Sequence, residues 1–334
     1  MAFSNSFDNP AAPGTGAGVG NREDLTNILS QLDPVSSPLV SLSPKRKASG
    51  TNHEWQMDQL SAPAHTGLLE GADVTSFDDK FEDRIRIGNV CQGFRRNYGV
   101  SQVQQAVSSA GNNAGRAEAR VKCMRELKRD IEAAVWSNQV RTTGSGSTKS
   151  LLQGMTTWLT TALADVPSQY RIGSDQVIAA TVTENGFNAA LASMFNVSGN
   201  LSTVTAILDT RTRRSVSEFM RMDTSYDGSG NADNRVRYTV SGTGKSVHLQ
   251  VDFFHSDFGS IKVMNSNPDT SQDTTFHDRG LLINFDYIGI AELIPLKTVD
   301  FEDQGGGARG MTEAWLTLEC HDPRAHAIID EGRS

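Results

Sequence analysis

Cysteine is scarce in this chain of 334 residues, which contains only Cys91, Cys123 and Cys320. An odd number of cysteines without a CxxC pair indicates neither a disulfide framework nor a cysteine-rich metal site. We therefore expect three reduced thiols that pack as small apolar side chains. Cys320, His321 and His326 lie close together near the C-terminus, but structural roles are favoured over metal ligation there.

Long hydrophobic runs are also missing. No stretch approaches the roughly 18 apolar residues that a membrane-spanning helix needs, so no transmembrane helix is predicted. The N-terminus lacks a basic segment followed by an apolar stretch, so no secretory signal is predicted either. An apolar content of 37% and a charged content of 21% predict a soluble protein with a substantial core, in two or three domains.

Motifs for catalysis and nucleotide binding are absent as well. Residues 241–246 look at first like a phosphate-binding loop, but Thr239 stands where the motif needs its first glycine, so a hairpin turn is favoured. Asp252, His255 and Asp257 lie close along the chain, yet no serine lies in a nucleophile-elbow context. We predict that the protein is not an enzyme, and we assign it no catalytic residue, cofactor or metal site.

Positive charge is in short supply overall, and it is unevenly distributed. The formal net charge is −8, which argues against a generic DNA-binding domain. Residues 80–141 nevertheless carry twelve Lys and Arg against six Asp and Glu, so this segment has a net charge of +6 and the remainder −14. One interpretation is a solvated helix with internal pairs such as Glu118 and Lys122. The other is that the basic segment of one copy meets acidic surface of another.

What the sequence does have is a long amphipathic helix, predicted over residues 100–138. Its apolar side chains recur mostly at steps of three and four, which keeps them on one stripe: Val103, Val107, Ala110, Ala114, Ala117, Val121, Met124, Ile131 and Val135. A helix of about 38 residues would be about 57 Å long. We expect the stripe to face the chain's own sheet. Gly111 and Gly115 interrupt the helix and predict a bend.

The segment before this helix contains little that could fold alone. Residues 1–20 are rich in Gly, Ala, Pro, Ser and Asn and predict an arm, and residues 22–32 predict a short helix. Residues 45–99 are polar and contain two strand-like pieces, 53–60 and 84–98. An isolated two-stranded hairpin is marginally stable, so this long excursion needs a partner surface.

Strands and helices alternate from about residue 175 onward, which predicts a mixed body of the α+β class. The expected strands are 176–181, 203–208, 281–290 and 312–320, the expected helices are 183–197 and 212–222, and a hairpin is expected over 236–253. The nearly continuous apolar run 281–290 predicts a single buried strand. The last strand places four apolar residues on one face: Ala314, Leu316, Leu318 and Cys320.

The order of these parts resembles that of the major capsid proteins of tailed bacteriophages, which have the Hong Kong 97 phage fold. Local sequences make it similar to one capsid family, related to the capsids of podophages with elongated heads. The stretches that carry the resemblance are Asn21-Arg22-Glu23-Asp24-Leu25, Ser101-Gln102-Val103-Gln104-Gln105-Ala106-Val107, Gly111, Glu126-Leu127-Lys128-Arg129-Asp130-Ile131-Glu132 and Leu318-Glu319-Cys320-His321-Asp322-Pro323-Arg324-Ala325-His326-Ala327. The similarity is strongest over about residues 21–138.

The resemblance implies a capsid subunit of the α+β class with four parts. These are an N-terminal arm with a short helix (1–44), an extended loop (45–99), a peripheral domain (100–174 and 296–334) with a spine helix over 100–138, and an axial domain (175–295). Subunits of this kind assemble into hexamers and pentamers that form an icosahedral shell around packaged double-stranded DNA, without sequence-specific binding. A separate scaffolding protein and a portal are further expected partners, and a membrane is not.

The expected location follows from the same resemblance. The protein would belong to the virion, as the major head protein of its capsid, and would be assembled in the cytoplasm of a host bacterium. An encapsulin-like compartment, which encloses cargo enzymes instead of a genome, is the alternative.

The resemblance also suggests candidate contacts between subunits. The extended loop would lie over an adjacent subunit and bury four apolar residues there: Trp55, Ile85, Ile87 and Val90. The alternative for Trp55 is packing within its own subunit. Arg95 and Arg96 would pair with carboxylates across an interface, or simply remain exposed to solvent.

Overall fold

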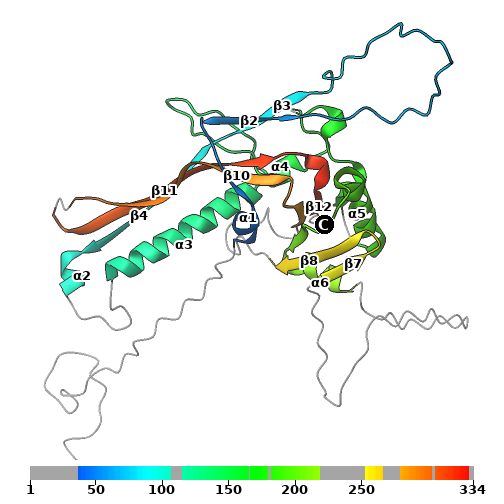
Figure 1. Ribbon diagram of the computed structural model, residues 1–334. Coiled ribbons are helices and arrows are strands. Elements are labelled where there is room, and N and C mark those ends of the chain that lie inside the picture. Colours follow the sequence, from blue (N-terminus) through cyan, green and yellow to red (C-terminus); the bar gives the residue numbers. More distant parts are fainter. Residues whose placement is uncertain are drawn as a thin grey trace, which may run out of the picture.

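The computed structural model describes residues 37–106, 115–164, 166–179, 182–218, 253–265, 279–302 and 305–330. The predicted arm 1–20, the helix 22–32 and the turn 241–246 lie outside these ranges, as does the hairpin 236–253 except for its last residue. Figure 1 shows that the described chain has an elongated part built on one sheet and a compact part built on another. Helices accompany both sheets, so the predicted α+β class is confirmed.

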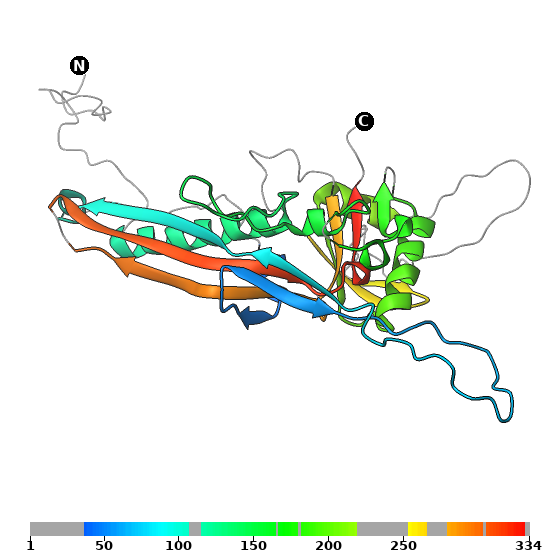
Figure 2. The same cartoon turned by 90° about the horizontal axis from the view of Figure 1, so that it is seen from above.

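The elongated part is a four-stranded sheet in the order β1-β10-β11-β4. Its strands are β1 (Lys45–Lys47), β10 (Ile288–Asp300), β11 (Gly307–Cys320) and β4 (Gln92–Ser101). The short β1 is parallel to β10, and the other neighbours are antiparallel. Helix α3 (Gly115–Trp136) runs along this sheet and packs against β4 and β11 (Figures 1 and 2).

The predicted long helix is divided into two elements in the structure. Helix α2 (Gln102–Ala106) follows β4, and α3 begins at Gly115; residues 107–114, with Gly111, are outside the described ranges. Cα atoms of α2 and α3 come within 8 Å of each other. Residues nine or more positions apart in one continuous helix would be separated by at least about 13 Å. The predicted helix over residues 100–138 is therefore not one straight element, which agrees with the bend predicted at the glycines.

The apolar stripe of this region also differs from the prediction. Val103 and Val121 are 73% and 41% exposed, whereas Ile131 and Val135 are buried as expected. The side chains that α3 buries are Cys123, Leu127, Ile131, Glu132, Val135 and Trp136. Val121 does not face the sheet, because Cys123 and Leu127 define the buried face of α3 and Val121 lies on the opposite side of the helix.

The compact part is a mixed six-stranded sheet in the order β5-β12-β9-β6-β8-β7. Its strands are β5 (Val177–Ala179), β12 (Ala327–Asp330), β9 (Arg279–Asn284), β6 (Val204–Leu208), β8 (Gly259–Asn265) and β7 (Phe253–Ser256). Helices α5 (Glu184–Ser198) and α6 (Thr210–Glu218) accompany it. The predicted helix 183–197 and strand 203–208 are thus confirmed to within a residue or two.

Residues 281–290, predicted as one strand, form the end of β9 and the start of β10, which belong to different sheets. The break is a turn, in which the Tyr287 amide donates to the Asn284 carbonyl at 3.2 Å. The Asn284 side chain stabilises it, because its Oδ1 accepts a hydrogen bond from the Asp286 amide at 3.1 Å. Strand β10 thus belongs to the sheet of the elongated part, and β12 to the sheet of the compact part.

The excursion predicted over residues 45–99 is shorter than expected. Strand β2 (Asn52–Met57) pairs in antiparallel fashion with β3 (Ile85–Val90), and the chain then enters the four-stranded sheet as β4. Cys91 lies alone between β3 and β4, where its amide donates to the Thr51 carbonyl at 2.7 Å. The predicted strand 84–98 is therefore two strands with different partners.

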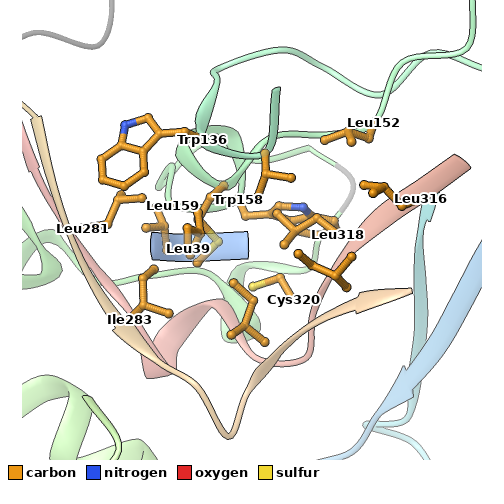
Figure 3. Packing of buried hydrophobic residues seen from close by; sticks show 14 of the residues in the cluster. Leu39, Trp136, Leu152, Trp158, Leu159, Leu281, Ile283, Leu316, Leu318 and Cys320 are labelled. Atoms are coloured by element: carbon orange, nitrogen blue, oxygen red, sulfur yellow. The ribbon is translucent and has the colours of Figure 1, made fainter. Parts of the chain in front are cut away.

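One hydrophobic core joins the two parts (Figure 3). It gathers buried side chains from both sheets and from α3, together with those of α1 (Pro38–Leu42) and α4 (Met155–Trp158): Leu39, Trp136, Leu152, Trp158, Leu159, Leu281, Ile283, Leu316, Leu318 and Cys320. Short 3-10 turns at Ser168–Tyr170, Ser174–Gln176 and Pro323–Ala325 complete the described chain. Among the described residues, no helix is long and apolar enough to cross a membrane.

All three cysteines are free and buried, as predicted. Burial raises the pKa of Cys91 to about 11 and the pKa of Cys320 well above its ordinary value. Both thiols therefore stay protonated at neutral pH and behave as apolar side chains.

Candidate functional site

The segment between β2 and β3, residues 58–84, projects beyond the body in both views and forms no regular strand or helix (Figures 1 and 2). We call it the projecting loop. Six of its large apolar side chains are between 64% and 96% exposed: Leu60, Leu68, Leu69, Val74, Phe77 and Phe81. Single exposed apolar residues are ordinary, but a series of them on one unpaired segment marks an interaction surface.

The projecting loop is also acidic. It carries seven Asp and Glu against two Lys and Arg, a net charge of −5. The outer face of α3 has the opposite character, because Lys122, Arg125 and Lys128 are exposed and Arg129 is half-buried there. The projecting loop and this face of α3 are therefore complementary in charge.

Strands β2 and β3 form the root of the projecting loop, and Trp55 on β2 fixes this root to the body. Its indole Nε1 donates to the Cys320 carbonyl at 3.1 Å, and its ring centroid lies 5.8 Å from that of Trp158. Ile87 and Val90 on β3 are only 6% and 5% exposed, and Ile85 packs against the same core. Of the two interpretations of Trp55, packing within its own subunit describes the structure.

The four apolar candidates therefore contact their own chain, and Ile87 and Val90 have almost no surface left for a neighbour. The physical reason is register. Trp55, Ile85 and Ile87 share one face of the β2–β3 pair, and that face packs on the core, whereas Val90 has the opposite register at the end of β3 and is buried there. The side chains available to another copy lie further out, on the projecting loop.

The two arginine candidates are also paired within the chain. Both are exposed on β4, where Arg95 Nη2 lies 3.2 Å from Glu313 Oε2 on the neighbouring β11. Arg96 makes a bidentate ion pair with Asp130 on α3, with nitrogen–oxygen distances of 2.6 and 2.7 Å. Arg96 thus links the sheet to the helix, and neither arginine needs a neighbouring copy to find a carboxylate.

Sequence reasoning missed Asn89, which is fully buried on β3 and makes four hydrogen bonds. Its Nδ2 donates to the carbonyls of Gln153 and Leu318 at 3.1 and 2.9 Å. Its Oδ1 accepts from the amides of Gln153 and Val90 at 2.7 and 2.8 Å. One side chain therefore joins the loop root to β11 and to the segment before α4. A polar residue next to Gly88 within an apolar strand was the signal.

A second polar cluster lies on the other side of Trp55, around the buried carboxylate of Glu319. His53 Nε2 lies 2.5 Å from Glu319 Oε1, and His321 Nε2 and Arg46 Nε lie 3.2 and 3.4 Å from Oε2. Burial raises the pKa of Glu319, but the two imidazoles lower it by more, so the net pKa lies below its ordinary value. Glu319 is therefore an anion held between strands β1, β2 and β11.

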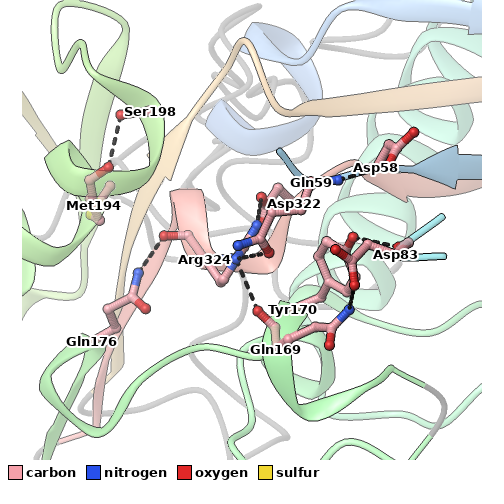
Figure 4. Close-up of polar contacts among 10 residues, drawn as sticks. All are labelled: Asp58, Gln59, Asp83, Gln169, Tyr170, Gln176, Met194, Ser198, Asp322 and Arg324. Carbon is pink, nitrogen blue, oxygen red and sulfur yellow. Dashed lines mark hydrogen bonds and ion pairs between the residues drawn. The ribbon is translucent and has the colours of Figure 1, made fainter. Parts of the chain in front are cut away.

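Arg324 contacts the chain at the point where the projecting loop leaves the body (Figure 4). Arg324 Nη1 donates to Gln59 Oε1 at 3.1 Å and to the Gln169 carbonyl at 2.9 Å, while its Nη2 pairs with Asp322 at 2.8 Å. Opposite it, the Tyr170 hydroxyl donates to the Asp83 carbonyl at 2.7 Å. These contacts fix both ends of the projecting loop to the compact part.

The residues of the rejected catalytic and metal motifs have structural surroundings in the described ranges. Asp252 lies outside them, and His255 contacts Ser260 Oγ at 2.8 Å. Cys320 and His326 are fully buried, and burial lowers the pKa of His326 to about 3, so its imidazole is neutral. Among the residues that the structure describes, no group of three His, Cys, Asp or Glu side chains is placed to hold a metal ion.

Comparison with known proteins gives consistent matches. The family model described as SU10 major capsid protein matches residues 9–332. The major capsid protein of Escherichia phage Phieco32 is 28% identical over 124 residues, which are 37% of this chain and 35% of that protein. The chain thus matches only about a third of the length of this curated relative.

Three solved structures show the same fold at low identity. The capsid of cyanophage P-SCSP1u has a TM-score of 0.59 at 14% identity, covering 96% of both chains. The capsid of the empty GTA particle has a TM-score of 0.60 at 13% identity, covering 98% of this chain and 100% of that one. The cyanophage A-1(L) capsid has a TM-score of 0.61 at 12% identity, covering 93% and 97%.

Proposed function

Because the chain belongs to the SU10 major capsid protein family, we propose that its copies assemble into hexamers and pentamers that form the icosahedral head shell of a phage around double-stranded DNA. Its α+β fold is of the Hong Kong 97 type, as the capsid structures described above share it. The observation that carries the proposal is the projecting loop, an apolar segment with no partner surface on its own described chain. An encapsulin-like compartment is not favoured, since the family and the structures compared are capsids of phages and phage-like particles.

The physical mechanism is the summation of many modest contacts. Burying one large apolar side chain contributes about 1.5–3 kcal/mol before the entropy of ordering the loop is subtracted. A single loop on a neighbour is therefore a weak contact. A closed shell repeats that contact in every subunit, and each subunit is held by several neighbours at once, so that the assembled state is stable although each interface is small.

Within this proposal the chain has four parts, as the family resemblance implies. They are the N-terminal arm (1–44), the extended loop (45–99), the peripheral domain (100–174 and 296–334) and the axial domain (175–295). The two sheets support the division into a peripheral and an axial domain, with β4 and β10 added to the former and β12 to the latter. We further propose a separate scaffolding protein, a portal, DNA bound without sequence specificity, and assembly in the host cytoplasm before incorporation into the virion.

Electron microscopy and sedimentation of the purified full-length chain test the proposal. We expect capsomers or closed shells, formed alone or after addition of a scaffolding protein from the same genome. A stable monomer of 36.1 kDa under all salt conditions, with and without scaffolding protein, would contradict it. The genomic neighbourhood separates the two kinds of shell, because terminase and portal genes indicate a phage head and a cargo enzyme gene indicates a compartment.

Charge complementarity between the loop and α3 makes a second prediction. The double substitution Asp78→Lys and Asp79→Lys reverses two acidic charges of the projecting loop. We expect the rate of assembly at low salt, measured by light scattering, to fall at least tenfold. Adding Lys122→Glu and Lys128→Glu on α3 should restore much of the rate. The matched control is Lys149→Glu, an exposed charge reversal outside both surfaces. Equal slowing by the control, or no rescue, would show that the loop meets a different surface.

A further inference from the structure

Glu132 is the one acidic residue that α3 buries completely. Its Oε1 accepts a hydrogen bond from the Leu39 amide at 2.9 Å, and its Oε2 accepts one from the Val40 amide at 2.8 Å. These amides belong to the first turn of α1, where backbone donors have no partner within the helix. A carboxyl group 92 to 93 residues away in sequence therefore caps the N-terminus of α1.

Helix α1 has no cap of its own. Ser37 occupies the capping position, but its side chain makes no capping hydrogen bond and instead lies 3.3 Å from Ser41 Oγ. Five residues are too few to form a stable helix in isolation. The position of α1 thus depends on two things, the burial of Pro38 and Leu39 in the core and the two hydrogen bonds to Glu132.

The surroundings of Glu132 contain no compensating charge in the described ranges. Residues 37–43 of α1 and its flanks include no titratable side chain. On α3, Lys128 is exposed and Arg129 is half-buried, and no charged side chain of any packed element is among the groups that shift the pKa of Glu132. Burial raises the pKa of Glu132 to about 7, against the two amides, which lower it. Because docking of α1 raises this pKa above the ordinary 4.5, Glu132 binds a proton more readily in the docked state than in the undocked state.

We propose that Glu132 is a positioning residue for α1: its carboxyl group docks α1 on α3 and holds it more tightly at acidic than at neutral pH. The docking is strongest below about pH 4.5 and weakens as the pH rises through 7, by a factor on the order of 100. Docking itself is a property of the single chain. Only its consequence for shells rests on the proposed function.

Hydrogen exchange of the unassembled full-length chain tests the docking. We expect protection factors of residues 37–43, corrected for intrinsic exchange, to fall on the order of 100-fold between pH 4.5 and pH 7.5. Glu132→Gln keeps an acceptor but cannot ionise, so its protection should be nearly constant over this range. Glu132→Ala removes both acceptors and should lose protection at every pH. Glu118→Gln, a half-buried position of the same helix, is the matched control and should follow the wild-type profile.

Two results would overturn the proposal: a wild-type pH slope retained by Glu132→Gln, or protection in Glu132→Ala equal to that of the wild type. If Glu132→Ala fails to fold, the Gln variant still decides, since it preserves the shape of the side chain. Electron microscopy of shells formed at pH 5 and pH 8 is a separate readout. Failure of the wild type to form any shell would contradict the proposed function and leave the exchange result standing.

Discussion

Replacing residues 61–81 by a Gly-Ser-Gly linker should leave a folded chain that forms no shells. The deletion keeps the contacts at the loop root, in which Asp58 pairs with Arg84 at 3.0 Å and Tyr170 holds the Asp83 carbonyl. It removes Leu68, Leu69, Val74, Phe77 and Phe81, which are exposed and contribute little to the folded monomer. We expect circular dichroism and the urea midpoint to match the wild type, while sedimentation shows only unassembled protein.

A substitution version separates loop chemistry from loop length. Leu68→Ser, Leu69→Ser and Phe77→Ser together should change the free energy of unfolding by less than about 1 kcal/mol, because exposed side chains contribute little to stability. The same variant should reduce shell yield at least tenfold, since each lost apolar contact is repeated in every subunit. Val140→Ser, at another exposed apolar position, is the control. Wild-type shell yield in the triple variant would exclude the projecting loop as the main apolar contact.

Elements whose ends are marked by neighbouring capping and terminating residues could be predicted from the sequence. Helix α5 is an example, because Thr183 caps it by accepting from the Gly186 amide and Gly199 ends it with a φ of 65°. Phe187, Leu191 and Met194 recur on the face that it buries. Periodicity and caps are properties of neighbouring residues, so reading them needs no knowledge of the rest of the fold.

Elements whose limits depend on distant partners could not be predicted in the same way. The apolar run 281–290 looks like one strand because both β9 and β10 are buried, and only the Asn284 turn divides them. The apolar stripe over residues 100–138 differs from the prediction for a related reason. Its small residues fit the helical period equally well in several registers, and the sheet beneath α3 selects the one with Leu127 inside.

The structure shows how the candidate residues of the extended loop pack within one chain, and their contacts with a neighbouring copy stay a prediction. Sequence reasoning assigned Trp55 and Ile87 to a neighbour because an amphipathic hairpin must bury its apolar face somewhere. It could not tell that this surface is the chain's own Trp158 and Cys320, more than a hundred residues away. Glu132 gave a local signal, a carboxylate beside Ile131 in a helix segment that ends in buried Trp136, but its partners on α1 were not deducible.

Asn89→Ala should strongly destabilise the loop root. It leaves two amides and two carbonyls of the buried interior without their partner, and each unsatisfied group costs about 1–3 kcal/mol unless water reaches it. Partial relaxation reduces the sum, so we expect a loss of about 3–5 kcal/mol, measured as a lower urea midpoint at unchanged slope. Asn97→Ala, an exposed asparagine on β4, should stay within about 0.5 kcal/mol of the wild type.

Asn89→Asp distinguishes hydrogen bonding from packing at the same position. The carboxylate is nearly the same size, yet it cannot donate to the carbonyls of Gln153 and Leu318, and it places a charge in the interior. Its loss of stability should equal or exceed that of Asn89→Ala, and hydrogen exchange should show β3 losing protection before β9 does. If instead the Asp variant were as stable as the wild type, the hydrogen bonds that Asn89 donates would not be needed, and the contacts of Trp55, Arg324 and Tyr170 would hold the loop root. The projecting loop would then survive loss of Asn89, and shell yield would be unaffected.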